Sequence, residues 1–280
     1  MGKRTARAPI DPVSQKTAAE IDVASKIDQP IAALGELQRS LLFAEISMLA
    51  YLPDREATPV FERVGFREVR YIERDGAQAY ELATDDDVVI ACRGTEPNEW
   101  NDLRADANAF TDLAETVGRV HRGFKREVDD IWPALEQTLR EETRDVWFCG
   151  HSLGGAMAQI CAGRCRLSDI AAEPREVVTF GSPRVGTKRY LRHAALRHIR
   201  WVNNNDIVTR VPPRWLRYSH TGARRYLNRH GDIATLTKHQ RARDRWSGFR
   251  SGLKARKFDH FSDHAIVEYV RHIRRAAESA

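Results

Sequence analysis

The chain has 280 residues, of which 42% are hydrophobic, 30% charged and 8% aromatic. These proportions exclude wholesale disorder, and the length suits one large α/β domain or two small ones. No stretch approaches the ~18 uncharged apolar residues of a membrane-spanning helix, and no apolar run of ~7–15 residues follows the basic N-terminus as in a secretory signal. We therefore expect a cytoplasmic or membrane-peripheral protein, and export by a route without such a signal stays open.

The net charge of +6 is distributed unevenly along the chain. Residues 214–257 contain 13 Lys or Arg and two Asp or Glu, a local charge of +11, so the other residues together carry −5. Such a basic block predicts an anionic partner, either a membrane surface or a nucleic acid. Trp215, Trp246 and Phe249 lie among the cations, and aromatic side chains favour the lipid interface. We expect an anionic membrane surface; a solvated basic loop is the alternative, and no nucleic-acid-binding motif accompanies the segment.

Residues 1–30 are polar, show little periodicity and predict a flexible arm. Residues 31–280 predict a single domain, in which apolar residues at helical spacing alternate with short apolar runs typical of strands. Helices are expected at 31–52, 120–139, after residue 152, at 188–196 and at 264–276. Strands are expected at 69–72, 79–82, 88–92, 146–149, 177–180 and 198–202. This alternation predicts a mostly parallel sheet covered by helices on both faces.

The segment VWFCGHSLGG (146–155) sets Ser152 between glycines, after an apolar strand and before a run of small residues suited to a helix. In a nucleophile elbow, a strained strand-to-helix turn raises the serine Oγ above the sheet, and the residues two before and two after must be small. Gly150 and Gly154 meet that requirement. The alternative is a glycine-rich turn in which Ser152 only caps the helix.

A nucleophilic serine needs a base within hydrogen-bond distance and a carboxylate that orients this base. Asp206 follows the predicted strand at 198–202, at the strand end where ligands gather in parallel sheets. Asp169, after the elbow helix, is less well placed. The alternative for Asp206 is a turn-forming residue after three asparagines.

The base is expected near the last helix, in the segment FDHFSDHAIVEYV. His264 is favoured over His260 because the apolar periodicity of the helix begins directly after it. His121 precedes the serine in the chain and His151 adjoins it, so both suit the role less. Any of these histidines could instead be a surface or core residue.

Six segments, taken together and in order, resemble the lipase class 3 family of α/β hydrolases. They are ACRGTEPNEWNDLRAD (91–106), VHRGF (120–124), FCGHSLGGAMA (148–158), VVTFGSPRVG (177–186), NNNDIVTRVPP (203–213) and SDHAIVEYV (262–270). The resemblance covers roughly residues 35–275. It implies an α/β-hydrolase fold, with a mostly parallel central sheet and the nucleophile elbow after a central strand.

The resemblance also implies the roles of individual residues. Ser152 would be the nucleophile, Asp206 the orienting acid and His264 the base, which the family marks by a tyrosine five residues later, here Tyr269. The segment Arg93-Gly94-Thr95 matches the loop that supplies half of the oxyanion hole. Thr95 would donate there, together with the backbone N–H of Leu153; the alternative for this segment is a plain turn.

The function expected from these matches is hydrolysis of lipid esters, triacylglycerols or phospholipids, through a Ser-His-Asp triad and an acyl-enzyme. No metal or organic cofactor is expected. The four cysteines, including Cys161 and Cys165 at helical spacing, are expected to be small buried residues rather than metal ligands. A short-chain carboxylesterase and a non-catalytic lipid- or partner-binding protein on the same scaffold are the alternatives.

Two segments depart from the family pattern, and the structure of a third, residues 106–118, is open to two interpretations. A basic insertion at about 231–257 is longer and more charged than the family requires, and the arm at 1–30 has no counterpart in it. Residues 106–118 follow Trp100 and Asp102, where the family packs the entrance to its lid. They predict either a lid over an acyl-binding groove or an ordinary surface helix.

Overall fold

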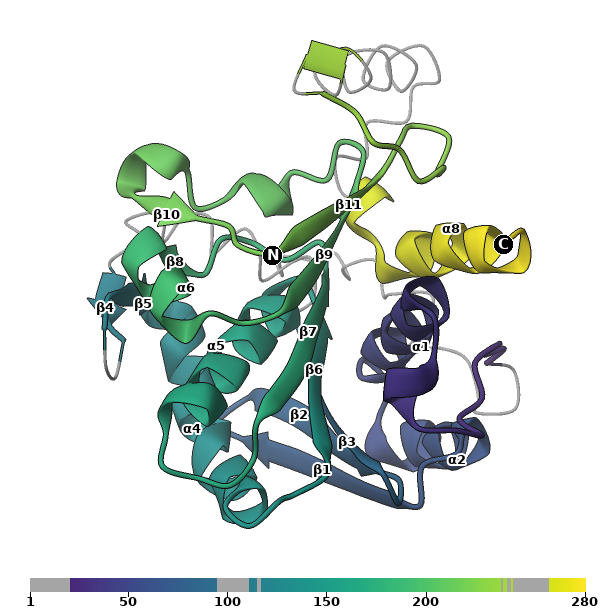
Figure 1. Ribbon diagram of the computed structural model, residues 1–280, viewed down its shortest axis with the longest axis vertical. Helices are drawn as coiled ribbons and strands as arrows, with labels where there is room; N and C mark the ends of the chain where they lie inside the picture. The colour runs from purple at the N-terminus through teal and green to yellow at the C-terminus, as the bar shows by residue number, and fades with distance from the viewer. Residues whose placement is uncertain (1–20, 95–110, 115–116, 238, 241–242, 244–261) are drawn as a thin grey trace, which may run out of the picture.

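The computed structural model describes residues 21–94, 111–114, 117–237, 239–240, 243 and 262–280. A seven-stranded sheet runs through its centre, in the order β1-β2-β3-β6-β7-β9-β11 (Figure 1). Its strands are β1 (Glu68–Arg74), β2 (Ala77–Ala83), β3 (Asp87–Cys92), β6 (Asp145–His151), β7 (Pro174–Phe180), β9 (His198–Asn203) and β11 (Ala223–Leu227). The first three pair antiparallel, and those from β3 to β11 pair parallel.

Helices cover both faces of this sheet (Figure 1). One face carries α1 (Glu36–Leu49), α2 (Asp54–Val64) and α8 (Ile266–Glu278). The other carries α4 (Arg122–Leu139), α5 (Leu153–Leu167) and α6 (Lys188–Ala194). Alternate residues of β6 serve the two cores: Trp147 packs in the α1/α8 core, and Phe148 in the α4/α5 core. Strands buried on both faces are continuously apolar, which is why β3 and β6 were recognisable in the sequence.

A second, four-stranded sheet lies beside the main one, in the order β10-β8-β5-β4. Its members are β4 (Thr111–Leu113), β5 (Arg119–His121), β8 (Gly186–Thr187) and β10 (Tyr218–Ser219). Single turns of 3-10 helix at Ile31–Ala33, Val208–Arg210 (η3), Arg214–Leu216 (η4) and Ser262–His264 (η5) complete the description. Strands of two or three residues have too few side chains for a periodic pattern, so this sheet could not be predicted.

The predicted α/β-hydrolase fold is confirmed, with corrections to individual elements. The helix predicted at 31–52 is interrupted, because Leu34 is extended and α1 begins only at Glu36. The helix predicted at 120–139 begins at Arg122, since β5 occupies the preceding residues. The surface-helix alternative for 106–118 is wrong at Thr111–Leu113, which form β4.

The division into an arm at 1–30, a domain at 31–280 and a basic insertion at 231–257 stays a prediction. The described end of the arm, residues 21–30, lies against α1, where the carboxylate of Glu45 accepts the N–H groups of Ala24 and Ser25 at 2.9 Å each. Of residues 231–257, the structure describes 231–237, 239–240 and 243. Within the described ranges, no helix combines the length and the hydropathy needed to cross a bilayer.

Candidate active site

Ser152 lies on the tight turn between β6 and α5. Its φ of 58° and ψ of −128° are strained for a residue with a side chain. The turn is close-packed: a Cβ on Gly150 would overlap the backbone of Gly154, and a Cβ on Gly154 would overlap the carbonyl of Cys92. Ser152 therefore has the strand-turn-helix geometry of a nucleophile elbow, and its side chain makes no capping hydrogen bond to α5.

Three side chains that are far apart in the sequence meet above this turn. Ser152 Oγ lies 2.8 Å from Nε2 of His264, and Nδ1 of His264 lies 3.0 Å from Oδ2 of Asp206. All three side chains are buried, with at most 2% of each residue exposed. The structure thus joins a hydroxyl, an imidazole and a carboxylate by two consecutive hydrogen bonds.

Asp206 is held by three further elements of structure. Its Oδ1 accepts the N–H of Val208 at 2.9 Å, and its Oδ2 accepts the hydroxyl of Tyr269 at 2.6 Å. Tyr269 in turn accepts the N–H of Asn203, at the end of β9, at 2.9 Å. Burial, together with the charge of Asp206, raises the pKa of Tyr269, so its hydroxyl remains a donor. These contacts fix the position of the Asp206 carboxylate behind the imidazole of His264.

Two residues that the sequence analysis did not assign also shape the site. A Cβ on Gly181, whose φ is +60°, would lie 2.7 Å from Oδ2 of Asp206 and 2.9 Å from Nδ1 of His264. Tyr51 OH lies 2.9 Å from Nδ1 of His151, whose Nε2 lies 2.6 Å from the backbone oxygen of His264. The glycine after the strand VVTF was a usable signal for the first of these, whereas nothing local marks Tyr51.

His151 supports the site without serving as its base. Burial, and the proximity of His264, lower the pKa of His151 well below its usual value, so its ring is neutral. A neutral ring carries one proton, which Nε2 donates to the backbone oxygen of His264, leaving Nδ1 to accept from Tyr51. His151 thereby connects the C-terminal end of α1 to the segment that carries the imidazole.

The other candidates lie away from these three side chains or outside the described residues. Asp169 is exposed beyond the far end of α5. His121 accepts the N–H of Phe124 at 3.5 Å and stacks on its ring at the start of α4. Predictions outside the described residues concern Thr95, Trp100, Asp102, Asp106 and His260. The loop towards Thr95 begins against the elbow, because a Cβ on Gly94 would lie 2.7 Å from the His151 carbonyl.

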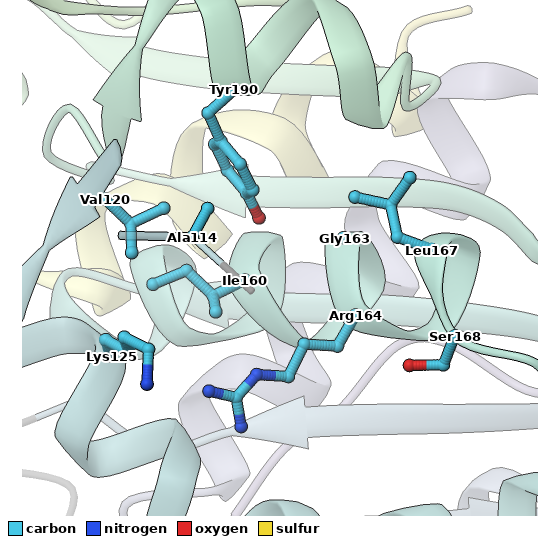
Figure 2. A pocket seen from close by; sticks show the side chains of 9 residues that line it. All are labelled: Ala114, Val120, Lys125, Ile160, Gly163, Arg164, Leu167, Ser168 and Tyr190. Carbon is cyan, nitrogen blue, oxygen red and sulfur yellow. The ribbon is translucent and has the colours of Figure 1, made fainter. Parts of the chain in front are cut away.

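The cysteines and a small cavity beside α5 could also be considered as sites for a metal or a small ligand, and both lie outside the triad. The four cysteines are buried and unpaired by disulfides, and within the described part of the chain no three His, Cys, Asp or Glu residues gather as metal ligands. A cavity of about 50 Å³ lies beside α5, where Tyr190 points its hydroxyl inward (Figure 2). This volume holds one or two water molecules and is too small for an acyl chain.

Comparison with known proteins agrees with this geometry. The family model described as "Lipase (class 3)" matches residues 89–215. Toxin TseL of Vibrio cholerae is 35% identical over 213 residues, which are 59% of this chain and 33% of the toxin. A lipase of Rhizopus oryzae is 31% identical over 129 residues, which are 42% of this chain and 33% of that lipase. The chain thus spans about a third of the length of these relatives.

Solved structures share the fold. The mono- and diacylglycerol lipase from Aspergillus oryzae superposes with a TM-score of 0.60 and 18% identity, covering 74% of this chain and 85% of that one. Lipase II from Rhizopus niveus gives 0.55 and 24%, covering 69% and 80%. The elbow, the sheet order and the family match over residues 89–215 agree with the expected resemblance to the lipase (class 3) family, and the fold is that of the α/β hydrolases.

Proposed function

We propose that this chain is a serine ester hydrolase that acts on lipid esters through an acyl-enzyme. The observation that carries the proposal is the pair of consecutive hydrogen bonds from Asp206 through His264 to the elbow serine, at 3.0 and 2.8 Å. Geometry of this kind supplies a nucleophile, its base and the group that orients the base. Lipases and phospholipases among the similar proteins support a lipid ester as substrate.

In the proposed reaction, the Oγ of Ser152 attacks the ester carbonyl while Nε2 of His264 takes the hydroxyl proton. Asp206 stabilises the resulting imidazolium through Nδ1. His264 then gives its proton to the leaving alcohol, and the acyl group stays on Ser152. A water molecule, deprotonated by the same imidazole, attacks the acyl-enzyme, so the fatty acid is released and the serine is restored.

The tetrahedral intermediate needs donors for its oxyanion. Leu153 is the first residue of α5, so its N–H has no acceptor within the helix and lies at the positive end of the helix dipole. We assign the second donor to Thr95, on the strength of the match of Arg93-Gly94-Thr95 to the family's oxyanion loop. Loss of one such donor raises the barrier by about 2.7–4 kcal/mol.

We further propose that the enzyme works at a membrane-peripheral position, on an anionic lipid surface. The basic segment 214–257 supports this partner, since it carries a local charge of +11. Cations near an anionic leaflet contribute ~1 kcal/mol each to binding. The relatives named as phospholipase A1 enzymes, from rice and Arabidopsis, are consistent with a substrate in such a surface.

The test compares the wild type with Ser152→Ala on a short-chain ester, a triacylglycerol and a phospholipid. Ser168→Ala is the matched control, because Ser168 caps the opposite end of the same helix. We expect Ser152→Ala to lose hydrolysis of every ester by at least ~10⁴-fold while the control retains it. Equal rates for the wild type and Ser152→Ala would exclude the mechanism and favour a binding protein.

A further inference from the structure

A strongly basic groove lies over the second sheet. Its volume is about 840 Å³, and its walls come from β4, β5, β8, β10, η4 and the start of α6. Among the described residues, five exposed cations and no acidic residue line it. We call this feature the basic groove; its cations are Arg119, Lys188, Arg189, Arg214 and Arg217.

The cations of the basic groove differ from those elsewhere in how they are paired. On the opposite side of the sheet, Arg39 pairs with Glu176 at 3.0 Å, and Arg274 with Glu45 at 2.6 Å. Across the described ranges, none of the five groove cations lies within 4 Å of a carboxylate. The groove therefore keeps its positive charge available to a ligand outside the chain.

The sequence around the groove explains why these cations have no carboxylate partner there. Residues 184–231 contain 12 Lys or Arg and a single acidic residue, Asp206. Asp206 is fully buried in its bonds to His264, Tyr269 and Val208, so it offers no exposed carboxylate. Like charges held together without counterions repel each other, and an external anion relieves that repulsion.

Two large apolar side chains project from the same region. Trp215 is 79% exposed and Leu113 is 65% exposed, the two highest values for large hydrophobic residues in the part of the chain described. Trp215 follows Arg214 in η4, and Leu113 lines the groove at the end of β4. A single exposed apolar residue is ordinary, but an exposed Trp beside unpaired cations is the composition of a membrane-interface surface.

The basic groove and the triad share one edge of the molecule. β8 follows the carboxyl end of β7, and η4 and β10 follow the carboxyl end of β9, on the same connection that carries Asp206. Figure 1 places β8 and β10 beside the end of the main sheet from which this connection departs. A surface bound in the groove would thus lie next to the edge at which an ester must enter.

We propose that the basic groove docks the enzyme on an anionic phospholipid bilayer, with Trp215 and Leu113 inserted at the interface. The inference rests on the proposed function, in that a lipid-ester substrate would lie in the docked bilayer. It goes beyond the basic segment 214–257, because three of the groove cations come from β5 and α6. A bilayer is favoured over a nucleic acid because an exposed Leu beside the groove gains from insertion into lipid.

The test measures co-sedimentation of the full chain with vesicles of equal parts phosphatidylglycerol and phosphatidylcholine, and with phosphatidylcholine alone. In the groove variant, Lys188, Arg189 and Arg214 are replaced by Gln. At about fivefold per cation, we expect its binding constant for anionic vesicles to fall about 100-fold. Its hydrolysis of a soluble short-chain ester should match the wild type, because none of these residues touches the triad.

Two control variants remove the same three charges elsewhere. Arg55, Arg74 and Arg166, all exposed, are replaced by Gln in the first. Lys254, Arg256 and Lys257, within the basic segment, are replaced by Gln in the second. We expect the first control to bind anionic vesicles within about fivefold of the wild type, because exposed charges outside the groove are screened by salt. The second control measures the share of the basic segment 214–257, and we expect it to lose less binding than the groove variant does.

Separate outcomes overturn docking in the groove and the proposed function. Wild-type binding by the groove variant, or a loss confined to the second control, would overturn docking in the groove. Binding to a DNA duplex that exceeds vesicle binding and disappears in the groove variant would replace the lipid partner by a nucleic acid. Vesicle binding without any ester hydrolysis would instead refute the proposed function and leave the docking proposal standing.

Discussion

The triad and the basic groove both lie at the carboxyl ends of the sheet strands, yet their polar groups are paired in opposite ways. Asp206 receives donors from Val208, Tyr269 and His264, all within hydrogen-bond distance and all buried. In the groove, the five cations are exposed, and none has a carboxylate partner among the described residues. Groups satisfied inside the chain fix a geometry for chemistry, whereas charges left unpaired are free to meet a partner. The geometry around Asp206 should therefore depend on each internal contact, whereas the groove should depend only on its summed charge.

The largest effect is expected from Asp206→Asn. The amide keeps the size of the side chain but removes the charge and can force His264 into the wrong tautomer, so kcat for a soluble ester should fall about 10⁴-fold. KM should change little, because Asp206 is buried behind the imidazole. A loss below tenfold in steady-state kinetics would show that this carboxylate does not orient the base.

A smaller effect, on stability, is expected from Glu45→Gln. Glu45 is 1% exposed, pairs with Arg274 of α8 and accepts two N–H groups of the segment before α1. Breaking a buried pair on one side should lower the free energy of unfolding by about 3 kcal/mol. The control is Glu36→Gln, whose half-exposed pair with Arg225 should contribute under ~1 kcal/mol. Equal losses in urea unfolding would remove the distinction between buried and exposed pairs.

The next effect is on the pH dependence of the free energy of unfolding, through the buried His198. Burial, reinforced by Arg200, lowers the pKa of His198 to about 3, so the folded protein keeps this ring neutral where the unfolded chain, with an ordinary pKa near 6.5, protonates it. The unfolded state therefore binds more protons between about pH 3 and 6.5, and stability falls as pH falls through that window. His198→Gln should reduce the loss between pH 7 and 5 by ~2 kcal/mol. An unchanged difference between urea unfolding at the two pH values would contradict this.

The smallest effect is expected from Tyr269→Phe. The variant removes one donor to Asp206 but leaves Val208 and His264 in place, so kcat should fall about tenfold with KM unchanged. The control is Tyr226→Phe, whose buried hydroxyl donates to Asn204 at 3.3 Å, outside the triad. If both variants kept wild-type kcat, the hydroxyl of Tyr269 would serve packing alone.

Features encoded by contiguous residues could be predicted from the sequence, whereas contacts between residues far apart in the chain could not. The strand before Ser152 and the small residues after it are contiguous, so the elbow was recognisable from ten residues, and the parallel sheet followed from repeated apolar runs. Asp206 and His264 could be chosen only by strand-end position and family resemblance, and their roles await the kinetic tests. No pattern marks Tyr51, because its contact with His151 joins residues 100 positions apart.

The location of the basic groove could not be predicted, because separate segments of the chain contribute its cations. Its charge was visible in the composition, but the prediction followed contiguous residues and chose 214–257, whereas folding gathers Arg119 and Lys188 beside Arg214. Short strands position these cations, and two-residue strands leave no periodic trace. Charge clustering in space thus needs the topology as well as the sequence.

The packing of α8 against α1 has a consequence for biosynthesis. The ribosome makes Ser152 and its elbow more than a hundred residues before His264, which is delivered by the segment leading into α8. Until α8 packs on α1, joined by Arg274 and Glu45, the imidazole is not held beside the hydroxyl. On the proposed mechanism, a nascent chain that still lacks α8 therefore cannot activate Ser152 for attack on an ester.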